Sequence, residues 1–230
     1  MISNTLPFLF LLVFPLTLIL SGCANTSSAR IAELQRRAEQ GNPDAQFHLG
    51  AALDNGPSDT THDADAVVWY RKAAEQGHAE AQNSLGSMYF LAQGVPEDAA
   101  EAVKWYRKAV EQDHGEASTN LGYMYDFGLG VAQDKQKAVE LYQRGAEKGS
   151  LNAMLNLGVA YWKGAWISRD LVHACKWLDL ARFYTQRSSD MRLKWRVRGT
   201  LDRVKKEMTK DQIRQAMTLG REWDASHRTR

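Results

Sequence analysis

Cysteine and histidine are the residues through which this sequence could bind a metal or attack a substrate. The chain of 230 residues has 2 cysteines and 6 histidines, and no two histidines have the spacing of zinc ligands. His78 and His114 fall between repeated segments, where a turn role is favoured over ligation. Serine-hydrolase, phosphate-binding and dinucleotide-binding motifs do not occur. We therefore expect no catalytic residue, no metal and no cofactor.

Cys23 is the residue best placed for covalent modification. Residues 1–22 carry no charged side chain, and the apolar run from Leu6 to Leu20 is 15 residues long. A membrane span needs about 20 residues, so the run suits a signal peptide better. It ends in Leu20-Ser21-Gly22-Cys23, which resembles a bacterial lipobox. The resemblance implies lipidation of Cys23, whose acyl chains would hold the mature protein on a membrane.

Two alternatives to a lipoprotein remain, an uncleaved anchor and an ordinary secreted precursor. The usual Lys or Arg near the start of a signal peptide is missing. Ala24, rather than aspartate, follows the cysteine, which resembles the outer-membrane sorting signal of enteric-type bacteria. The expected location is therefore the cell envelope, facing the periplasm, with the anchor in the outer membrane. Residues 23–29 are predicted to form a short polar tether.

A period of 36 residues organises the rest of the chain. Each unit has a segment with apolar residues at i, i+4, i+7 and i+8, a Gly- and Pro-containing turn, and a second apolar-periodic segment. The pattern predicts helix–turn–helix units, which stack because no unit buries its apolar face alone. Leu-Gly pairs recur in the first helices at 49–50, 85–86, 121–122 and 157–158. Glycine inside a helix costs roughly 1 kcal/mol relative to alanine, so we expect the partner helix to approach closely there.

This unit resembles the Sel-one-like repeat, a relative of the tetratricopeptide repeat. The third copy carries matching residues at Ala117, Leu121-Gly122, Met124-Tyr125, Asp134 and Tyr142. The resemblance covers roughly residues 43–186 and implies an all-α, right-handed α-solenoid that binds other proteins. The fourth copy departs from the pattern, because Trp166 stands where the other copies have glycine or serine.

The ends of the solenoid are predicted to be capped. We expect an N-terminal cap helix at 30–41, four repeats over 42–186 and basic C-terminal capping helices over 187–230. The C-terminal cap begins with a degenerate first helix, because Leu193 is in phase with Leu157. Thr209 and Gln212 have the spacing of a capping box and open the last helix.

The charge of the C-terminal end limits the classes of partner that it can bind, and the alignment of Cys175 predicts where that residue lies. Residues 186–230 hold 13 Lys or Arg against 6 Asp or Glu, and a basic end can touch anionic lipid or nucleic acid. Export argues against nucleic acid, and a solvated basic cap is the favoured interpretation. Cys175 aligns with Val67, Val103 and Val139, so it is expected in the core rather than in a disulfide.

The partner-binding surface is predicted on the first helices. Three alignment columns there vary freely between repeats and lie at i, i+4 and i+7 of one helix face. The resemblance places stacked first helices on the concave side, and aromatic residues are enriched in binding hot spots. The alternative is that Phe90 and Trp162 fill gaps between repeats. The expected binding residues, which we call the first-helix stripe, are Phe47, Asp54, Phe90, Tyr123, Asp126, Leu155, Trp162 and Trp166.

The expected function is that of a lipid-anchored periplasmic solenoid that binds another protein. Small lipobox-bearing proteins of this repeat type resemble the immunity partners of type VI secretion phospholipase effectors, which implies such an effector as the partner. The alternatives are an envelope scaffold or a regulatory adaptor for assembly, export or signalling. A hydrolase of the kind claimed for cysteine-rich relatives is a third alternative, and the missing cysteines count against it. The sequence leaves the oligomeric state open.

Overall fold

All regular structure is α-helical in the computed structural model, which describes residues 31–54, 60–164 and 166–227. The predicted signal peptide (1–22), Cys23 and the tether (23–29) lie outside the described residues. None of the described helices is both long and apolar enough to cross a membrane. A short helix at 31–39 comes first. The helices that follow are α2 (Pro43–Asp54), α3 (Thr60–Glu75), α4 (Ala79–Leu91), α5 (Ala99–Glu111), α6 (Gly115–Phe127), α7 (Lys135–Glu147), α8 (Leu151–Lys163), α9 (Leu171–Thr185), α10 (Met191–Lys206) and α11 (Lys210–His227).

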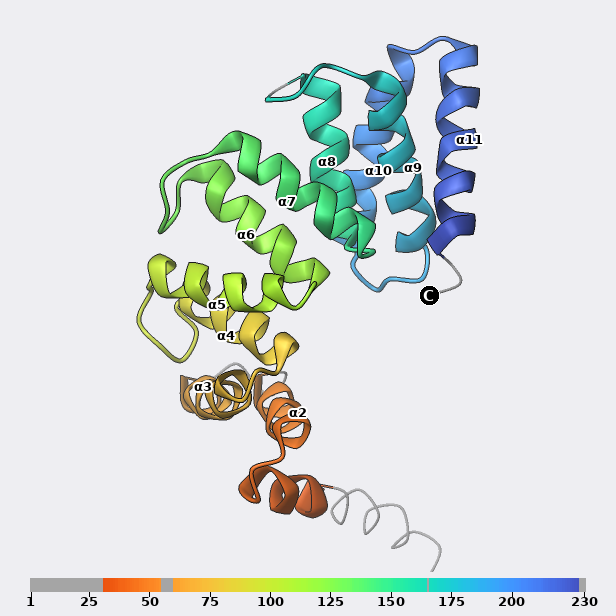
Figure 1. The fold of residues 1–230 in the computed structure, drawn as a ribbon. Helices are drawn as coiled ribbons and strands as arrows, with labels where there is room; N and C mark the ends of the chain where they lie inside the picture. The colour runs from red at the N-terminus through yellow and green to blue at the C-terminus, as the bar shows by residue number, and fades with distance from the viewer. Residues whose placement is uncertain (1–30, 55–59, 165, 228–230) are drawn as a thin grey trace, which may run out of the picture.

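The helices form pairs that stack on one another. α2 packs on α3, α4 on α5, α6 on α7 and α8 on α9, and each second helix packs on the first helix of the next pair. Figure 1 shows the pairs following one another from the N-terminal end at the bottom to α11 at the upper right. The predicted all-α solenoid is therefore confirmed.

The repeated glycine of the first helix marks the closest approach within a pair. A Cβ atom on Gly86 would lie 2.7 Å from the Tyr106 ring and 3.2 Å from the Ala102 carbonyl oxygen. The same conflict recurs for Gly122, where a Cβ atom would lie 2.9 Å from the Tyr142 ring. These distances are shorter than van der Waals contact, so a side chain at these positions would force the helices apart. The expected role of the glycines is confirmed.

Side chains in the turns cap the helices and fix their starts. Asp98 and Asp134 accept hydrogen bonds from the backbone N–H groups of Glu101 and Lys137, as N-cap aspartates do. The Nδ1 atoms of His78 and His114 accept hydrogen bonds from the backbone N–H groups of Ala81 and Ala117, at 3.2 and 3.1 Å. These two histidines therefore have the turn role that the sequence favoured.

The core runs through the stack as small and apolar side chains from both helices of each pair. Cys175 lies within it and is 0% exposed, in the place of the valines of the other repeats. Burial raises the pKa of the Cys175 thiol to about 11, so it stays protonated and unreactive at neutral pH.

The C-terminal end departs from the repeat. α11 packs on α9 rather than on α10, with the Trp177 and Trp223 ring centroids 5.5 Å apart. The physical reason is Lys194, which stands 36 residues after Gly158 in the glycine register. Even a Cβ atom on Gly158 would lie 2.6 Å from the Leu178 side chain. A lysine in that register therefore prevents the usual close pairing, and one side of α10 stays open.

Candidate protein-binding face

A hollow of about 470 Å³ opens on the first-helix side of the third and fourth repeats. Four helices contribute to its lining: α6, α7, α8 and α10, with the turn that follows α8. The 36-residue period places equivalent residues of successive first helices next to one another, so Tyr123 and Val159 both face it. The side chains most able to contact a partner there are Tyr123, Asp126, Lys135, Lys163, Trp166 and Arg196.

Asp126 is held in place at one wall of the hollow. Its carboxylate accepts from Lys135 Nζ at 2.6 Å and from the Tyr142 hydroxyl at 3.4 Å. Burial, and then the charge of Asp126, raise the pKa of Tyr142, so the phenol remains a hydrogen-bond donor. The pair Asp126–Lys135 links α6 to α7 and fixes both groups before any partner arrives.

Trp166 is an exposed ring held in a backbone conformation that favours glycine. Its φ is 74°, while Gly94 and Gly130, at the equivalent positions, have φ of 65° and 64°. An L-residue in the left-handed region costs roughly 1–2 kcal/mol. The Trp166 residue is 57% exposed, so core burial does not repay that cost. Strained residues of this kind gather at functional sites.

Aromatic side chains continue from the hollow toward α4. Phe90 lies edge-on to Tyr123 with ring centroids 6.1 Å apart, and Tyr123 lies 4.6 Å from Phe127. Tyr123 and Phe127 are 40% and 55% exposed. Phe90 is half-buried and packs on the core of the second and third repeats. The structure therefore brings Phe90, Tyr123, Asp126 and Trp166 of the first-helix stripe to one surface.

Comparison with known proteins agrees with this geometry. A family model described as the Sel1 repeat matches residues 43–78, 79–114, 115–150 and 151–182. The chain belongs to the Sel1 repeat family. The search of curated proteins found no match.

Solved structures of Sel1 repeat proteins share the fold. A protective antigen of uropathogenic Escherichia coli strains has 31% identity and a TM-score of 0.74; the match covers 86% of this chain but only 41% of the antigen. A Sel1 repeat protein from Oxalobacter formigenes has 32% identity and a TM-score of 0.57, over 68% of this chain and 70% of that one. An immunity protein from Pseudomonas aeruginosa matches at 18% identity and a TM-score of 0.35, over 70% and 81%. That identity and that TM-score are too low to support a conclusion about this chain.

Three residues of the first-helix stripe have packing roles, and for one of them the predicted place on the binding surface is wrong. Leu155 is 2% exposed and belongs to the core, so its assignment to the binding surface is wrong. Phe47 is half-buried and stacks on the capping His78 ring at 4.8 Å. Trp162 packs on the core and donates through Nε1 to Glu207 at 2.8 Å. That contact joins the last Sel1 repeat to α10, which is the gap-filling role left open for Trp162.

Asp54 belongs to the first-helix stripe but lies away from the hollow. It accepts a hydrogen bond from the Tyr70 hydroxyl at 3.2 Å, as Asp126 does from Tyr142 two Sel1 repeats later. The shared contact shows that an aspartate at this position serves the pairing of first and second helices. Asp126 adds the Lys135 ion pair, which Asp54 does not show among the described residues.

Sequence reasoning missed the contribution of α10. Trp195 is 76% exposed and Met191 is 70% exposed, and they stand 36 residues after Val159 and Leu155. Extending the repeat columns by one more period would have found both. Lys163 and Arg196, which also face the hollow, could not be found in this way. The column of Lys163 holds Leu91 and Phe127, and the column of Arg196 holds the buried Met88 and Met124.

No arrangement for metal or cofactor binding stands out in the part of the chain that the structure describes. No group of three or more His, Cys, Asp or Glu residues could hold a metal ion within these ranges. His173 lies beside the N-cap Asp170, with 2.7 Å between Nδ1 and the carboxylate. Rings and charged side chains line the candidate face, which suits recognition of another protein.

Proposed function

We propose that this protein is a lipid-anchored immunity protein that binds and neutralises a phospholipase effector of type VI secretion on the periplasmic side of the outer membrane. Cys23 carries the anchor in this proposal. The hollow and its exposed rings carry the binding. Neutralisation follows from occlusion, since an effector held on the first-helix face cannot present its active site to lipid.

The observation that carries the binding part is Trp166. It is exposed, strained and placed beside a hollow that is lined by the third and fourth Sel1 repeats and by α10. Selection for folding alone favours glycine at this φ, as the equivalent positions Gly94 and Gly130 illustrate. A large ring kept there at a cost of roughly 1–2 kcal/mol is best explained by contact with a partner.

The geometry also fits the energetics of a stable complex. A standard interface covers about 800 Å² on each partner, and a few central aromatic anchors supply most of its binding energy. Phe90, Tyr123, Phe127 and Trp166 provide such a centre. Each ring already contacts another ring or Lys135, and such contacts lower the entropy lost on binding.

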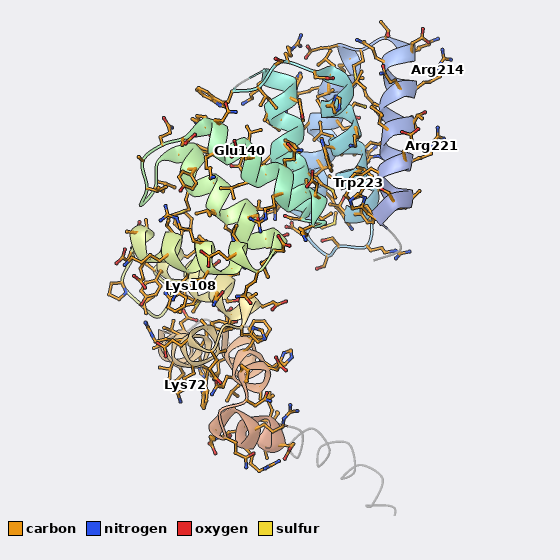
Figure 2. All side chains as sticks on the ribbon, in the orientation of Figure 1. Lys72, Lys108, Glu140, Arg214, Arg221 and Trp223 are labelled. Atoms are coloured by element: carbon orange, nitrogen blue, oxygen red, sulfur yellow. The ribbon has the colours of Figure 1, made fainter. Side chains whose placement is uncertain are left out.

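Site-specific photo-crosslinking tests the proposal. A photoreactive amino acid replaces Tyr123, and in a matched control it replaces Glu140, which is exposed and labelled in Figure 2 on α7. Glu140 lies off the face of α7 that lines the hollow, whose residues are Lys135, Ala138, Val139 and Tyr142. Irradiation in the producing cells, challenged by type VI secretion from kin, should trap one effector at position 123 and none at position 140.

The trapped protein then decides between the candidate functions. An effector with phospholipase activity that the purified protein inhibits supports immunity. Capture of an assembly, export or signalling component instead would make the protein an envelope scaffold or adaptor. Equal capture at both positions would contradict the first-helix face as the binding surface.

A further inference from the structure

The hollow is lined by more positive than negative charge. Its charged lining consists of three cationic side chains, Lys135, Lys163 and Arg196, and one carboxylate, that of Asp126. Asp126 is already engaged, since its carboxylate forms an ion pair with Lys135 at 2.6 Å. Lys163 and Arg196 have no carboxylate within ion-pair distance among the residues that the structure describes.

The neighbouring face of α10 extends this positive surface. Arg192 and Arg196 are exposed on it, together with the Trp195 ring at 76% exposure. α11 leaves this side of α10 uncovered because it packs on α9. The carboxylate of Glu207, at the end of α10, is occupied by Arg169. The result is a cationic hollow with the exposed Trp166 ring in its lining, next to a helix that carries the exposed Trp195 ring.

We propose that the partner recognised here presents an acidic segment, in which Asp or Glu side chains alternate with apolar ones. This inference rests on the proposed function. One carboxylate of that segment sits in the hollow between Lys163 and Arg196. Arginine binds carboxylates through two parallel hydrogen bonds, and the partial enclosure strengthens the attraction relative to open solvent. The apolar side chains of the segment pack on Trp166 and Trp195.

A protein segment fits this surface better than an anionic membrane does. Lys163 and Arg196 face a common recess from two helices, α8 and α10, so they can surround a protruding group. A bilayer is flat on this scale and reaches only what projects from the protein. Trp166, Lys135 and Asp126 line the same recess, so a segment that enters it meets side chains on several sides.

Fluorescence anisotropy with the full-length protein tests the inference. The probe is a short fluorescein-labelled peptide rich in glutamate and phenylalanine, compared with the same peptide carrying glutamine for each glutamate. The variant is Lys163→Gln/Arg196→Gln. The matched control is Arg214→Gln/Arg221→Gln, which removes the same charge from α11; Figure 2 shows both arginines on α11, at the right edge of the molecule. All of these side chains are exposed, and thermal unfolding checks that each variant is folded.

The wild-type protein should bind the acidic peptide, and its affinity should fall with salt. The Lys163→Gln/Arg196→Gln variant should bind roughly ten-fold more weakly, while the control keeps wild-type affinity. No binding of the acidic peptide, equal binding of the glutamine peptide, or equal losses in both variants would overturn the inference. So would stronger, Lys163-dependent binding to phosphatidylglycerol vesicles than to the peptide. Any of these results leaves crosslinking at Tyr123 free to succeed, so the two proposals fail separately.

Discussion

The ammonium group of Lys135 lies 5.0 Å from the centre of the Trp166 ring. The same ammonium group binds the Asp126 carboxylate at 2.6 Å and lies 5.4 Å from the centre of the Phe127 ring. Lys135 thus connects side chains of the third repeat to the turn of the fourth. A cation over an aromatic face is worth about 0.5–1 kcal/mol at an exposed site, which is less than the strain at Trp166.

Replacing Trp166 by glycine should separate binding from folding. Glycine relieves a left-handed strain of roughly 1–2 kcal/mol but adds chain entropy and loses the Lys135 contact, so the free energy of unfolding should stay within about 1 kcal/mol of wild type. Partner affinity should fall by about 2 kcal/mol. Trp166→Ala is the control, because it loses the ring and keeps the strain. Urea unfolding of a glycine variant far less stable than wild type would make Trp166 a structural residue.

Replacing glycine by alanine should have opposite effects on stability at two positions, one where helices approach closely and one where there is open space. Gly122→Ala should lower the free energy of unfolding by about 1–3 kcal/mol, because its Cβ atom would meet the Tyr142 ring at 2.9 Å. Gly199→Ala should raise it by up to about 1 kcal/mol, since Gly199 lies inside α10 with nothing within 4 Å of a Cβ atom. Denaturant titrations of both variants check this, and equal effects would contradict the close-approach account.

The buried thiol predicts a pH dependence of stability and of chemical reactivity. The unfolded chain loses the Cys175 proton near the ordinary thiol pKa of about 8.5, whereas the folded chain holds it to about pH 11. This contribution to stability is therefore fully present below about pH 8.5 and is lost as the pH rises through the folded pKa. A thiol-specific reagent at pH 8 should label Cys175 only after unfolding, and labelling of the native protein at the unfolded rate would place the residue outside the core.

The lipid anchor is tested by fractionation. Cys23→Ser removes the thiol that would be acylated, so the variant should appear in the soluble fraction or remain as an unprocessed precursor. The wild-type protein should fractionate with the outer membrane and shift in mass by its acyl chains. If the serine variant sediments with membranes as the wild type does, the lipobox interpretation is wrong.

Much of the fold followed from the 36-residue period because local and long-range signals agree. The helix pairs, the aspartate caps and the close approach at the Leu-Gly pairs were all predicted. So was the capping box at the last helix, where Thr209 and Gln212 exchange hydrogen bonds with each other's backbone at 2.9 and 3.2 Å. The packing of α11 was not predicted, because it depends on Lys194 replacing a glycine in the register.

The binding surface was predicted less well, because variation between repeats has two causes. The alignment column that contains Leu155 also contains Thr119. The Thr119 side chain is 3% exposed, and its hydroxyl forms a hydrogen bond with the Ser150 hydroxyl at 2.7 Å. A Cβ atom on Gly145 would lie 2.8 Å from the Thr119 hydroxyl oxygen, so the glycine leaves room for this side chain in the core. Leu155 and Thr119 are both buried although their column varies, and a single sequence does not distinguish such variation in the core from free variation at an exposed face.

The most direct test of the account compares Tyr123→Ala with Leu121→Ala, against the partner trapped by crosslinking. Tyr123 is 40% exposed at the hollow, while Leu121, two residues earlier on α6, is 4% exposed. Calorimetric affinity and thermal unfolding are measured for both variants. Tyr123→Ala should weaken partner binding by about 2 kcal/mol or more with nearly unchanged melting. Leu121→Ala should lose about 2–5 kcal/mol of stability. A Tyr123→Ala protein that melts early, or that binds its partner as tightly as wild type, would contradict the first-helix face as the binding site.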